Sequence, residues 1–404
     1  MTINNNETAL RDIKNSAYLN NMTRVTIIQP SLAKYRVPVY RELAKRPGID
    51  LQVIYGMSEG IPNVEPSGFS AKFSPLRVAQ TNTGHILWHN AQFDFATRKH
   101  CDVLILSWDV HYASLLPALA RARANGIATI LWGHGYSKTE RPWRAWLRQV
   151  PARFADVLLF YSQGPARTYV ERYGWDQNRV VVASNALDQT AIKAARSEWL
   201  SNRDKLIQFK EKHGLDGRPV ILMCSRLEVA NRADLLLRAT ARLLESIPDV
   251  KVLVVGTGDA EPDLRRLSQE LDLGDRVKFV GPVYDEKELA PWFMSADVYC
   301  YPQNIGLSLL HAFGYGLPVV TSDRLETHNP EIEALKPCAN GLLYRHGDIQ
   351  DLADSLQRLL TDKELRNELS EGARRTVSDE YSLGRMVDGF VEAIRTGTAR
   401  RGLS

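Results

Sequence analysis

Residues 301–320 decide the fold more clearly than any other stretch, and their sequence is YPQNIGLSLLHAFGYGLPVV. The stretch begins at the end of an apolar run and passes through a loop that contains Gly306. A helix of about two to three turns follows, a glycine stops it, and apolar residues then start a new strand. A strand, a helix and a second strand in this order are typical of a doubly wound α/β sheet.

The same alternation extends outward over both halves of the chain. Short apolar runs predict strands in the first half at residues 25–28, 51–55, 103–106, 127–131, 157–160 and 180–182. Similar runs predict strands in the second half at residues 220–224, 250–255, 277–280, 298–301 and 318–321. Continuous apolar strands between helices indicate parallel sheets covered on both faces. We therefore predict an α/β protein with two tandem Rossmann-like doubly wound domains facing a cleft, where ligands lie beyond the strand ends.

The length of 404 residues also favours two domains. Residues 189–218 interrupt the pattern with a charged stretch that predicts one polar helix and a turn. We expect the following parts: a loose leader at 1–21, an N-terminal Rossmann-like domain at 22–188, a linker region at 189–218, a C-terminal Rossmann-like domain at 219–381, and a C-terminal helix with a solvated basic tail at 382–404.

Composition excludes several classes of protein. The formal net charge of +4 is too small to demand nucleic acid, so we predict no nucleic-acid partner. The four cysteines stand far apart without metal-ligand spacing, which predicts buried free thiols in a reducing cytosol and no metal. No apolar stretch approaches the roughly 20 residues of a membrane-spanning helix. The expected location is cytoplasmic, with peripheral contact to the inner membrane face as an option.

Three strand ends in the second half could meet an anion. Arg226 follows one strand, and its planar guanidinium suits phosphate oxygens, although pairing with a nearby carboxylate is an equal alternative. Gly256 follows another strand and by itself indicates only a turn. The first amides of the helix near Gly306 and Leu307 lie at its positive end and favour a diphosphate. His311 lies one turn later, facing either this ligand or the core.

These motifs resemble those of the GT-B glycosyltransferases, in particular retaining family 4, also called group 1. The resemblance covers residues 24–395 and is strongest over residues 220–343. The family's Gly-Arg-Leu followed by Lys-Gly corresponds here to Ser225-Arg226-Leu227 and Asn231-Arg232. The resemblance implies that Arg226 holds the donor's pyrophosphate. Asn231 replaces the family's lysine, and we expect Arg232 to supply the missing charge.

The family's two glutamates align with Gln303 and His311, so both positions are changed. A histidine can still bind ribose hydroxyls through one ring nitrogen. The resemblance implies a donor site formed by Arg226, Asn231, Arg232, Gly256, Gln303, Asn304, Ile305, Gly306, Leu307 and His311.

In the first half, Lys34 and Arg36 lie in the first strand-to-helix loop, where many relatives carry glycines. They either bind phosphate or acceptor or form a solvated basic turn. His134 follows a strand between two glycines, which indicate close backbone approach or a plain turn. The resemblance implies that His134 contacts the transferred sugar or the acceptor.

The implied reaction is the transfer of a sugar from a nucleotide diphosphate sugar to a hydroxyl acceptor with retention, in polysaccharide, glycolipid or other glycoconjugate biosynthesis. His134, Arg226 and Arg232 are the expected catalytic residues, and the nucleotide sugar is a co-substrate without a further cofactor or metal. Two alternatives use the same architecture: a nucleotide-sugar 2-epimerase and a non-catalytic nucleotide-sugar-binding protein.

Residues 141–154 predict a short helix with two distinct sides. Arg141, Arg144 and Arg148 lie on one side, and the other carries Trp143, Leu147, Val150 and Phe154. Basic and aromatic groups together suit an anionic membrane surface where a lipid-linked acceptor is met. The alternative is that the apolar side packs on the domain.

Overall fold

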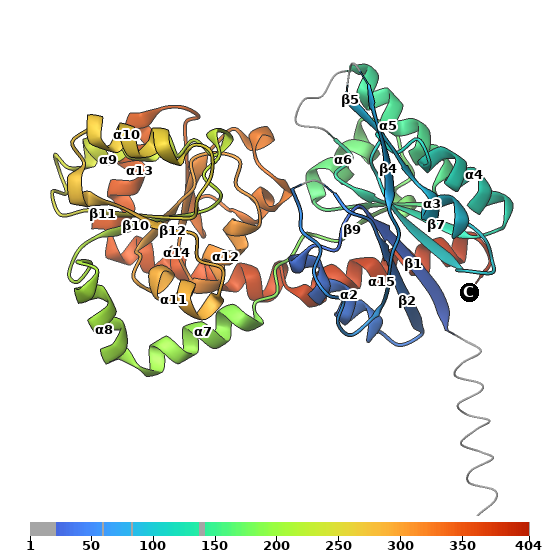
Figure 1. Ribbon diagram of the computed structural model, residues 1–404, viewed down its shortest axis with the longest axis horizontal. Helices are drawn as coiled ribbons and strands as arrows, with labels where there is room; N and C mark the ends of the chain where they lie inside the picture. The colour runs from blue at the N-terminus through green and yellow to red at the C-terminus, as the bar shows by residue number, and fades with distance from the viewer. Residues whose placement is uncertain (1–21, 59, 82–83, 137–141, 404) are drawn as a thin grey trace, which may run out of the picture. The chain divides into compact units, whose positions relative to one another are not determined.

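The computed structural model describes residues 22–58, 60–81, 84–136 and 142–403, and the expected leader lies outside these residues (Figure 1). The chain divides into two compact units. Unit 2 is the continuous segment Asn185–Ser382, and unit 1 combines the described residues up to Ser184 with those from Leu383 onward.

Unit 1 contains a parallel seven-stranded sheet in the order β3-β2-β1-β6-β7-β8-β9. Its strands are β1 (Thr23–Gln29), β2 (Ile49–Tyr55), β3 (Ser70–Phe73), β6 (Val103–Ser107), β7 (Ala128–Gly133), β8 (Val157–Phe160) and β9 (Val180–Val182). An antiparallel hairpin is formed by β4 (Leu76–Thr81) and β5 (Gly84–His89). Its helices are α2 (Val37–Ala44), α3 (Asn90–Asp94), α4 (Leu115–Ala124), α5 (Pro142–Phe154), α6 (Gln163–Glu171) and α15 (Leu383–Arg400).

The last helix, α15, completes unit 1 by packing on α2, β7 and β8 (Figure 1). Phe390 of α15 meets Trp132 of β7 edge to face, with ring centroids 4.7 Å apart. The prediction that the C-terminal helix within residues 382–404 ends in a solvated basic tail is wrong. The helix continues to Arg400, Thr398 is buried, and Arg401 Nε lies 2.9 Å from Asp156 Oδ2.

Unit 2 contains a parallel six-stranded sheet in the order β12-β11-β10-β13-β14-β15. Its strands are β10 (Val220–Cys224), β11 (Lys251–Val255), β12 (Val277–Gly281), β13 (Val298–Cys300), β14 (Val319–Ser322) and β15 (Gly341–Tyr344). Its helices are α7 (Thr190–Ser201), α8 (Arg203–Lys212), α9 (Ala233–Leu243), α10 (Glu261–Glu270), α11 (Glu286–Met294), α12 (Leu307–Tyr315), α13 (Ile349–Thr361) and α14 (Lys363–Arg375). The predicted strands of both units are therefore present, and two doubly wound sheets confirm the α/β fold class.

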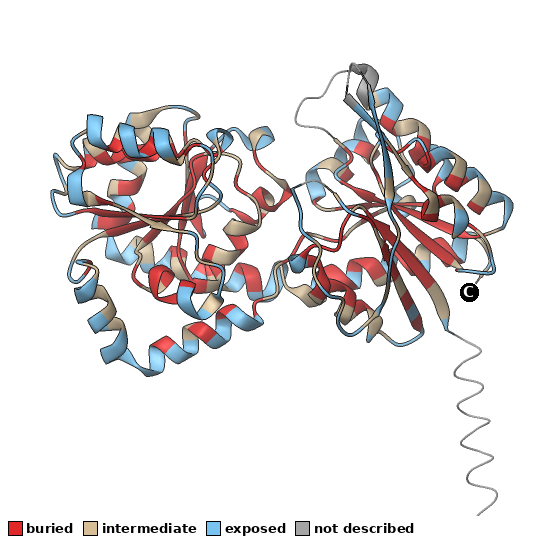
Figure 2. Cartoon of the chain, viewed as in Figure 1, coloured by how far each residue is buried: buried red, intermediate tan, exposed pale blue. Residues whose placement is uncertain are grey.

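The sheet of unit 2 is buried on both faces, as Figure 2 shows. Successive strand residues point to opposite faces, so Ile221 packs in the cluster with α9 and α13, and Leu222 packs in the cluster with α7, α11 and α12. The segment 189–218, expected to hold one polar helix, contains two helices, α7 and α8. Ile192, Ala195 and Trp199 of α7 are buried in the core of unit 2.

The expectations for the cysteines and for membrane-spanning helices can be compared with the structure. All four cysteines are free, but only Cys101 and Cys300 are buried, and Cys338 is exposed, so the prediction of buried thiols is wrong for Cys338. None of the helices in the described part of the chain is long and apolar enough to cross a membrane.

His89 at the end of β5 makes stability depend on pH. Its side chain is fully buried, and neither ring nitrogen has a hydrogen-bond partner within the described residues. Burial lowers the pKa of His89 from 6.5 to about 4. Below pH 6.5 the His89 ring is therefore protonated in the unfolded chain but stays neutral in the folded chain. The free energy of unfolding falls as the pH drops from 6.5 to 4.

We predict that His89→Phe removes this loss, which amounts to about 3 kcal/mol of the free energy of unfolding between pH 7 and pH 4. Urea unfolding of both proteins across this pH range measures the difference. His85→Phe, at an exposed position of the same strand, is the control and keeps the wild-type slope. Equal slopes for His89→Phe and wild type would contradict the assignment.

Candidate functional site

The carboxyl ends of three adjacent strands bring the predicted donor residues of unit 2 together. β10 lies between β11 and β13, so the loops that follow these strands leave the same edge of the sheet. The backbones approach closely there, because a Cβ at Gly256 would stand 1.9 Å from the carbonyl oxygen of Ser225. Gly256 also has a φ of +127°, which side chains rarely adopt. A glycine is therefore required by packing within unit 2.

Asn231 joins the loop after β10 to the loop after β13. Its side chain is 3% exposed, and its Nδ2 donates a 2.7 Å hydrogen bond to the carbonyl oxygen of Arg226. Its Oδ1 accepts a 2.9 Å hydrogen bond from Nδ2 of Asn304. The residue at the family's lysine position therefore holds two loops together, and Asn304 can take its left-handed φ of +65° within this network.

Arg226 itself points into solvent. Its side chain is 77% exposed, and its Nη1 lies 3.0 Å from Oε1 of Glu228. The carboxylate pairing that the sequence left as an alternative is thus present. An exposed ion pair of this kind contributes about 0–1 kcal/mol. A bound diphosphate can displace Glu228 at little cost.

Arg232 is held differently. It adopts a φ of +54°, and its Nε and Nη2 donate to the two carboxylate oxygens of Asp234 at 2.8 and 2.9 Å. The hydrogen bond with Asp234 raises the pKa of Arg232, against the opposing effect of its burial. The charge that the sequence assigned to the donor is therefore balanced by a neighbouring carboxylate.

The start of α12 is fixed by the loop that contains Asn329. Gly306 is the N-cap residue, and a Cβ there would stand 3.0 Å from Nδ2 of Asn329. The same Nδ2 donates to the carbonyl oxygens of Asn304 and Ile305. Ile305 is buried, and its amide donates to Nδ1 of His328 at 3.2 Å. Ile305 therefore faces the core, whereas Gln303, Gly306 and Leu307 are partly exposed.

His311 is paired with a carboxylate that the sequence analysis missed. Its Nε2 lies 3.0 and 3.1 Å from the two oxygens of Glu286, the first residue of α11. The Tyr315 hydroxyl donates to Oε1 of Glu286 at 2.6 Å. Burial, followed by this hydrogen bond, raises the pKa of Tyr315. The Asp285 N-cap marks a helix start in the sequence, but nothing local to it shows that Glu286 reaches α12.

In unit 1 the Arg36 guanidinium lies among aromatic rings near the ends of the strands. Arg36 is 7% exposed, and its guanidinium carbon lies 4.6 Å from the Trp132 ring and 4.9 Å from the Tyr161 ring. The exposed His134 ring lies 4.7 Å from Tyr161. Lys34 is exposed on the short helical turn Lys34–Arg36. Arg36 is thus no part of a solvated basic turn, and Tyr161, just after β8, was missed by the sequence analysis.

The glycines beside His134 are explained by packing inside unit 1. A Cβ at Gly133 would lie 2.7 Å from the Cβ of Trp108, and one at Gly135 would lie 2.4 Å from the Phe160 ring. Gly135 also has a φ of +71°. Close packing against neighbouring side chains and, at Gly135, a positive φ that a turn requires both account for these glycines.

Helix α5 exposes an apolar stripe. Trp146 is 61% exposed, and Leu147 and Phe154 are also exposed, together with Arg153. The predicted basic side is wrong at Arg148, which is 7% exposed. Arg141 lies outside the described residues, and the described side chains of the helix begin at Ala145.

Within the described residues, no group of three or more His, Cys, Asp or Glu side chains could hold a metal ion.

We predict that Asn231→Ala destabilises unit 2 by about 1–3 kcal/mol, because it leaves the Asn304 amide and the Arg226 carbonyl without their partner. Urea unfolding measures the loss. Asn125→Ala removes an exposed amide bonded to a single carbonyl and serves as the control, with a smaller effect. If both variants lose the same stability, Asn231 does not join the loops as described.

Comparison with known proteins shows which families the chain is similar to. Residues 205–376 match the family model described as "Glycosyl transferases group 1". The chain is 31% identical over 222 residues to the D-inositol 3-phosphate glycosyltransferase of Nocardia farcinica, covering 52% of this chain and 46% of that protein. This chain spans about half the length of the curated relatives it matches.

Solved structures share the fold over nearly the whole chain. The Anabaena protein Alr3699/HepE in complex with UDP superposes with a TM-score of 0.69 at 15% identity, covering 93% of this chain and 100% of that one. A glycosyltransferase from Rickettsia africae gives 0.70 at 15% identity, with 93% and 99% covered. Residues 205–376 therefore resemble the glycosyl transferases group 1, and the chain shares the fold of these solved structures, with two Rossmann-like units.

Proposed function

We propose that this protein transfers a sugar from a nucleotide diphosphate sugar to a hydroxyl acceptor, with retention of the anomeric configuration and without a metal ion. The products belong to polysaccharide, glycolipid or other glycoconjugate biosynthesis. The relatives support this proposal, since the Nocardia protein is named a glycosyltransferase and the Anabaena protein was solved with UDP.

The single observation that carries the proposal is the link, through Asn231, between the loop that bears Arg226 and the loop that leads into α12. Asn231 bonds to the Arg226 backbone and to Asn304, two residues before the N-cap of α12. An exposed guanidinium and the positive end of a helix thus belong to one set of joined loops. Permanent charge and oriented amides are the groups that stabilise phosphate oxygens.

The chemistry follows from where negative charge develops. As the bond from the sugar to the diphosphate breaks, charge accumulates on the departing phosphate oxygens. Arg226 and the first amides of α12 stabilise this charge, which lowers the barrier because the helix amides are already oriented. Arg226 must first exchange Glu228 for the phosphate. A phosphate oxygen of the leaving group takes the proton of the acceptor hydroxyl on the same face of the sugar.

The remaining donor contacts follow from the other partners. We assign the ribose hydroxyls to His311 and Glu286, because their paired ring and carboxylate offer both a donor and acceptors. Gly256 lets the loop after β11 approach the loop after β10 at the strand ends. Arg232 contributes once Asp234 releases it. Gln303 and Leu307, both partly exposed, complete the donor side.

We assign the acceptor to unit 1, with His134 and Lys34 as the exposed groups that contact it. Arg36 stacks among Trp132 and Tyr161 and adds positive charge below them. The name of the Nocardia relative specifies a phosphorylated polyol, and cations beside a histidine suit an acceptor of that chemistry.

Donor binding and product analysis test the proposal. Nucleotide sugars that bind the folded protein raise its melting temperature in proportion to their affinity. The stabilising donor is then incubated with polyol, glycan and lipid acceptors in buffer that contains EDTA. A glycoside with the donor's anomeric configuration supports the proposal. Epimerised nucleotide sugar without acceptor, or binding without any turnover, would replace it with the epimerase or the binding protein.

We predict that Arg226→Ala lowers kcat by about 100-fold or more, because a charged group that stabilises the leaving diphosphate is lost. Arg265→Ala is the matched control: Arg265 is an exposed arginine of unit 2 that pairs with Glu261, and its loss leaves turnover unchanged. Steady-state assays of the two variants decide the question. Near-normal turnover of Arg226→Ala would refute the role of this side chain.

We propose that the exposed stripe of α5 touches an anionic membrane surface, where a lipid-linked acceptor is met. Wild-type protein is expected to float with vesicles that contain anionic lipid and not with neutral vesicles. The double variant Trp146→Ser/Phe154→Ser should lose most of this binding, because it removes two exposed aromatic side chains. Equal flotation of the double variant would exclude α5 as the contact.

A further inference from the structure

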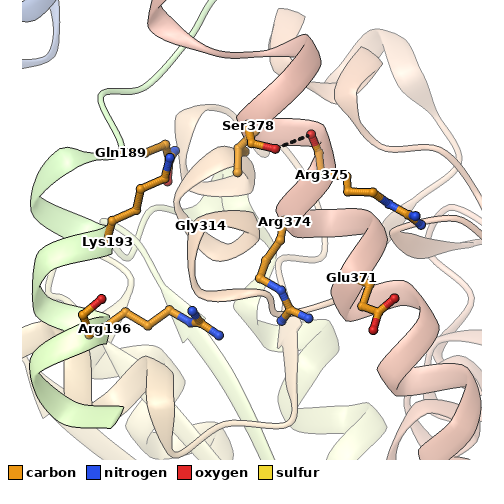
Figure 3. Close-up of a pocket in the computed structure, with 10 residues that line it drawn as sticks. Gln189, Lys193, Arg196, Gly314, Glu371, Arg374, Arg375 and Ser378 are labelled. Carbon is orange, nitrogen blue, oxygen red and sulfur yellow. Dashed lines mark hydrogen bonds between the residues drawn. The ribbon is translucent and has the colours of Figure 1, made fainter. Parts of the chain in front are cut away.

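A cavity lies in unit 2 at the far end of α12. It has a volume of about 540 Å³, within the usual range for small-molecule sites. The cavity lies among α7, α14 and the last turn of α12, whereas Gly306 begins that helix at the donor loops (Figure 3). Its lining contains four cationic side chains and one carboxylate: Lys193, Arg196, Arg374, Arg375 and Glu371.

Two of the arginines face one another across the cavity. Figure 3 shows the Arg196 side chain extending from α7 toward the guanidinium group of Arg374, while Arg375 points away. Among the described residues, neither Arg196 nor Arg374 forms an ion pair, and the Nε of Arg196 is buried without any hydrogen-bond partner. Arg374 donates one bond, to the neutral Ser370 hydroxyl at 2.7 Å. Two like charges therefore approach each other without a compensating anion.

Electrostatics agree with this geometry. Burial, followed by the charge of Arg374, lowers the pKa of Arg196. An anion between the two guanidinium groups would reverse both effects, because it replaces lost hydration and screens the repulsion. Oxyanions with several oxygens, such as phosphate, match the fork of donors that each guanidinium presents.

A buried polar atom adds a second, independent observation. Gln189 is 7% exposed, and its Nε2 donates to the carbonyl oxygen of Leu310 at 3.2 Å. Its Oε1 is buried at the cavity and has no hydrogen-bond partner in the described residues. A Cβ at Gly314 would stand 2.1 Å from this oxygen, so the glycine leaves room for it. An unpaired amide oxygen needs a donor such as a hydroxyl.

We propose that this cavity binds a small phosphorylated ligand that also carries a hydroxyl group, at a site separate from the proposed donor site. The phosphate lies between Arg196 and Arg374, and the hydroxyl donates to Oε1 of Gln189. Lys193, which also lines the cavity, adds positive charge. Glu371 disfavours a second phosphate on the same ligand, because its carboxylate lines the same cavity. This inference stands independently of the function proposed above.

Glycerol 3-phosphate is the test probe, because it combines one phosphate with hydroxyls, and inorganic phosphate and glycerol are its comparisons. Isothermal titration of the full chain is expected to give the tightest binding for glycerol 3-phosphate and none for glycerol. Arg196→Gln and Arg374→Gln should each weaken binding about tenfold or more, since each removes a charged donor. Arg196→Lys keeps the charge and gives an intermediate loss, with melting temperatures confirming that each variant is folded.

Two further variants separate the parts of the proposal. Gln189→Leu should bring the affinity for glycerol 3-phosphate down to that for inorganic phosphate. Arg226→Ala leaves the donor loops without their guanidinium and should bind the probe as wild type does. Unchanged affinity in both Arg196→Gln and Arg374→Gln, loss of binding in Arg226→Ala alone, or no binding of either phosphate probe to wild type would overturn the proposal.

Discussion

Parallel strands must all end at the same edge of their sheet, and the candidate site of unit 2 depends on this constraint. The loops after β10, β11 and β13 all start at this edge, so they pack closely against one another. Their backbone groups are removed from water and need partners, or each unpaired group costs free energy. Gly256 has no side chain, so the Ser225 carbonyl can approach it closely. Asn231 donates a hydrogen bond to the Arg226 carbonyl and accepts one from Asn304. The position of Arg226 is a consequence of these contacts.

Asn231 and His311 stand where the group 1 pattern has charged residues, and the structure shows what each of them contacts. Asn231 no longer carries a charge and instead fastens two loops. His311 replaces a carboxylate, yet the carboxylate of Glu286 stands 3.0 Å from its ring. A carboxylate is therefore present beside position 311, but it comes from α11 and not from α12 itself.

The sequence was sufficient for elements whose pattern is local and was insufficient where partners come from elsewhere. Apolar runs predicted β10 to β14, and glycines predicted the end of α12, where Gly316 has a φ of +77°. The strand β3 escaped notice because most of its residues are exposed, so it lacks an apolar run. Helical spacing grouped Arg148 with other arginines, but spacing alone does not reveal that Arg148 is buried. The pair of Glu286 and His311 joins α11 to α12, and no pattern within either segment predicts this contact.

The return of α15 to unit 1 has a consequence for biosynthesis. Unit 2 is one uninterrupted segment, whereas unit 1 needs both Trp132 and Phe390, which are separated by all of unit 2. A ribosome delivers these partners in order, so unit 2 can acquire its core while β7 and β8 still lack the helix that covers them. Unit 1 closes last, and a nascent chain stalled before Leu383 would present that uncovered sheet face to chaperones.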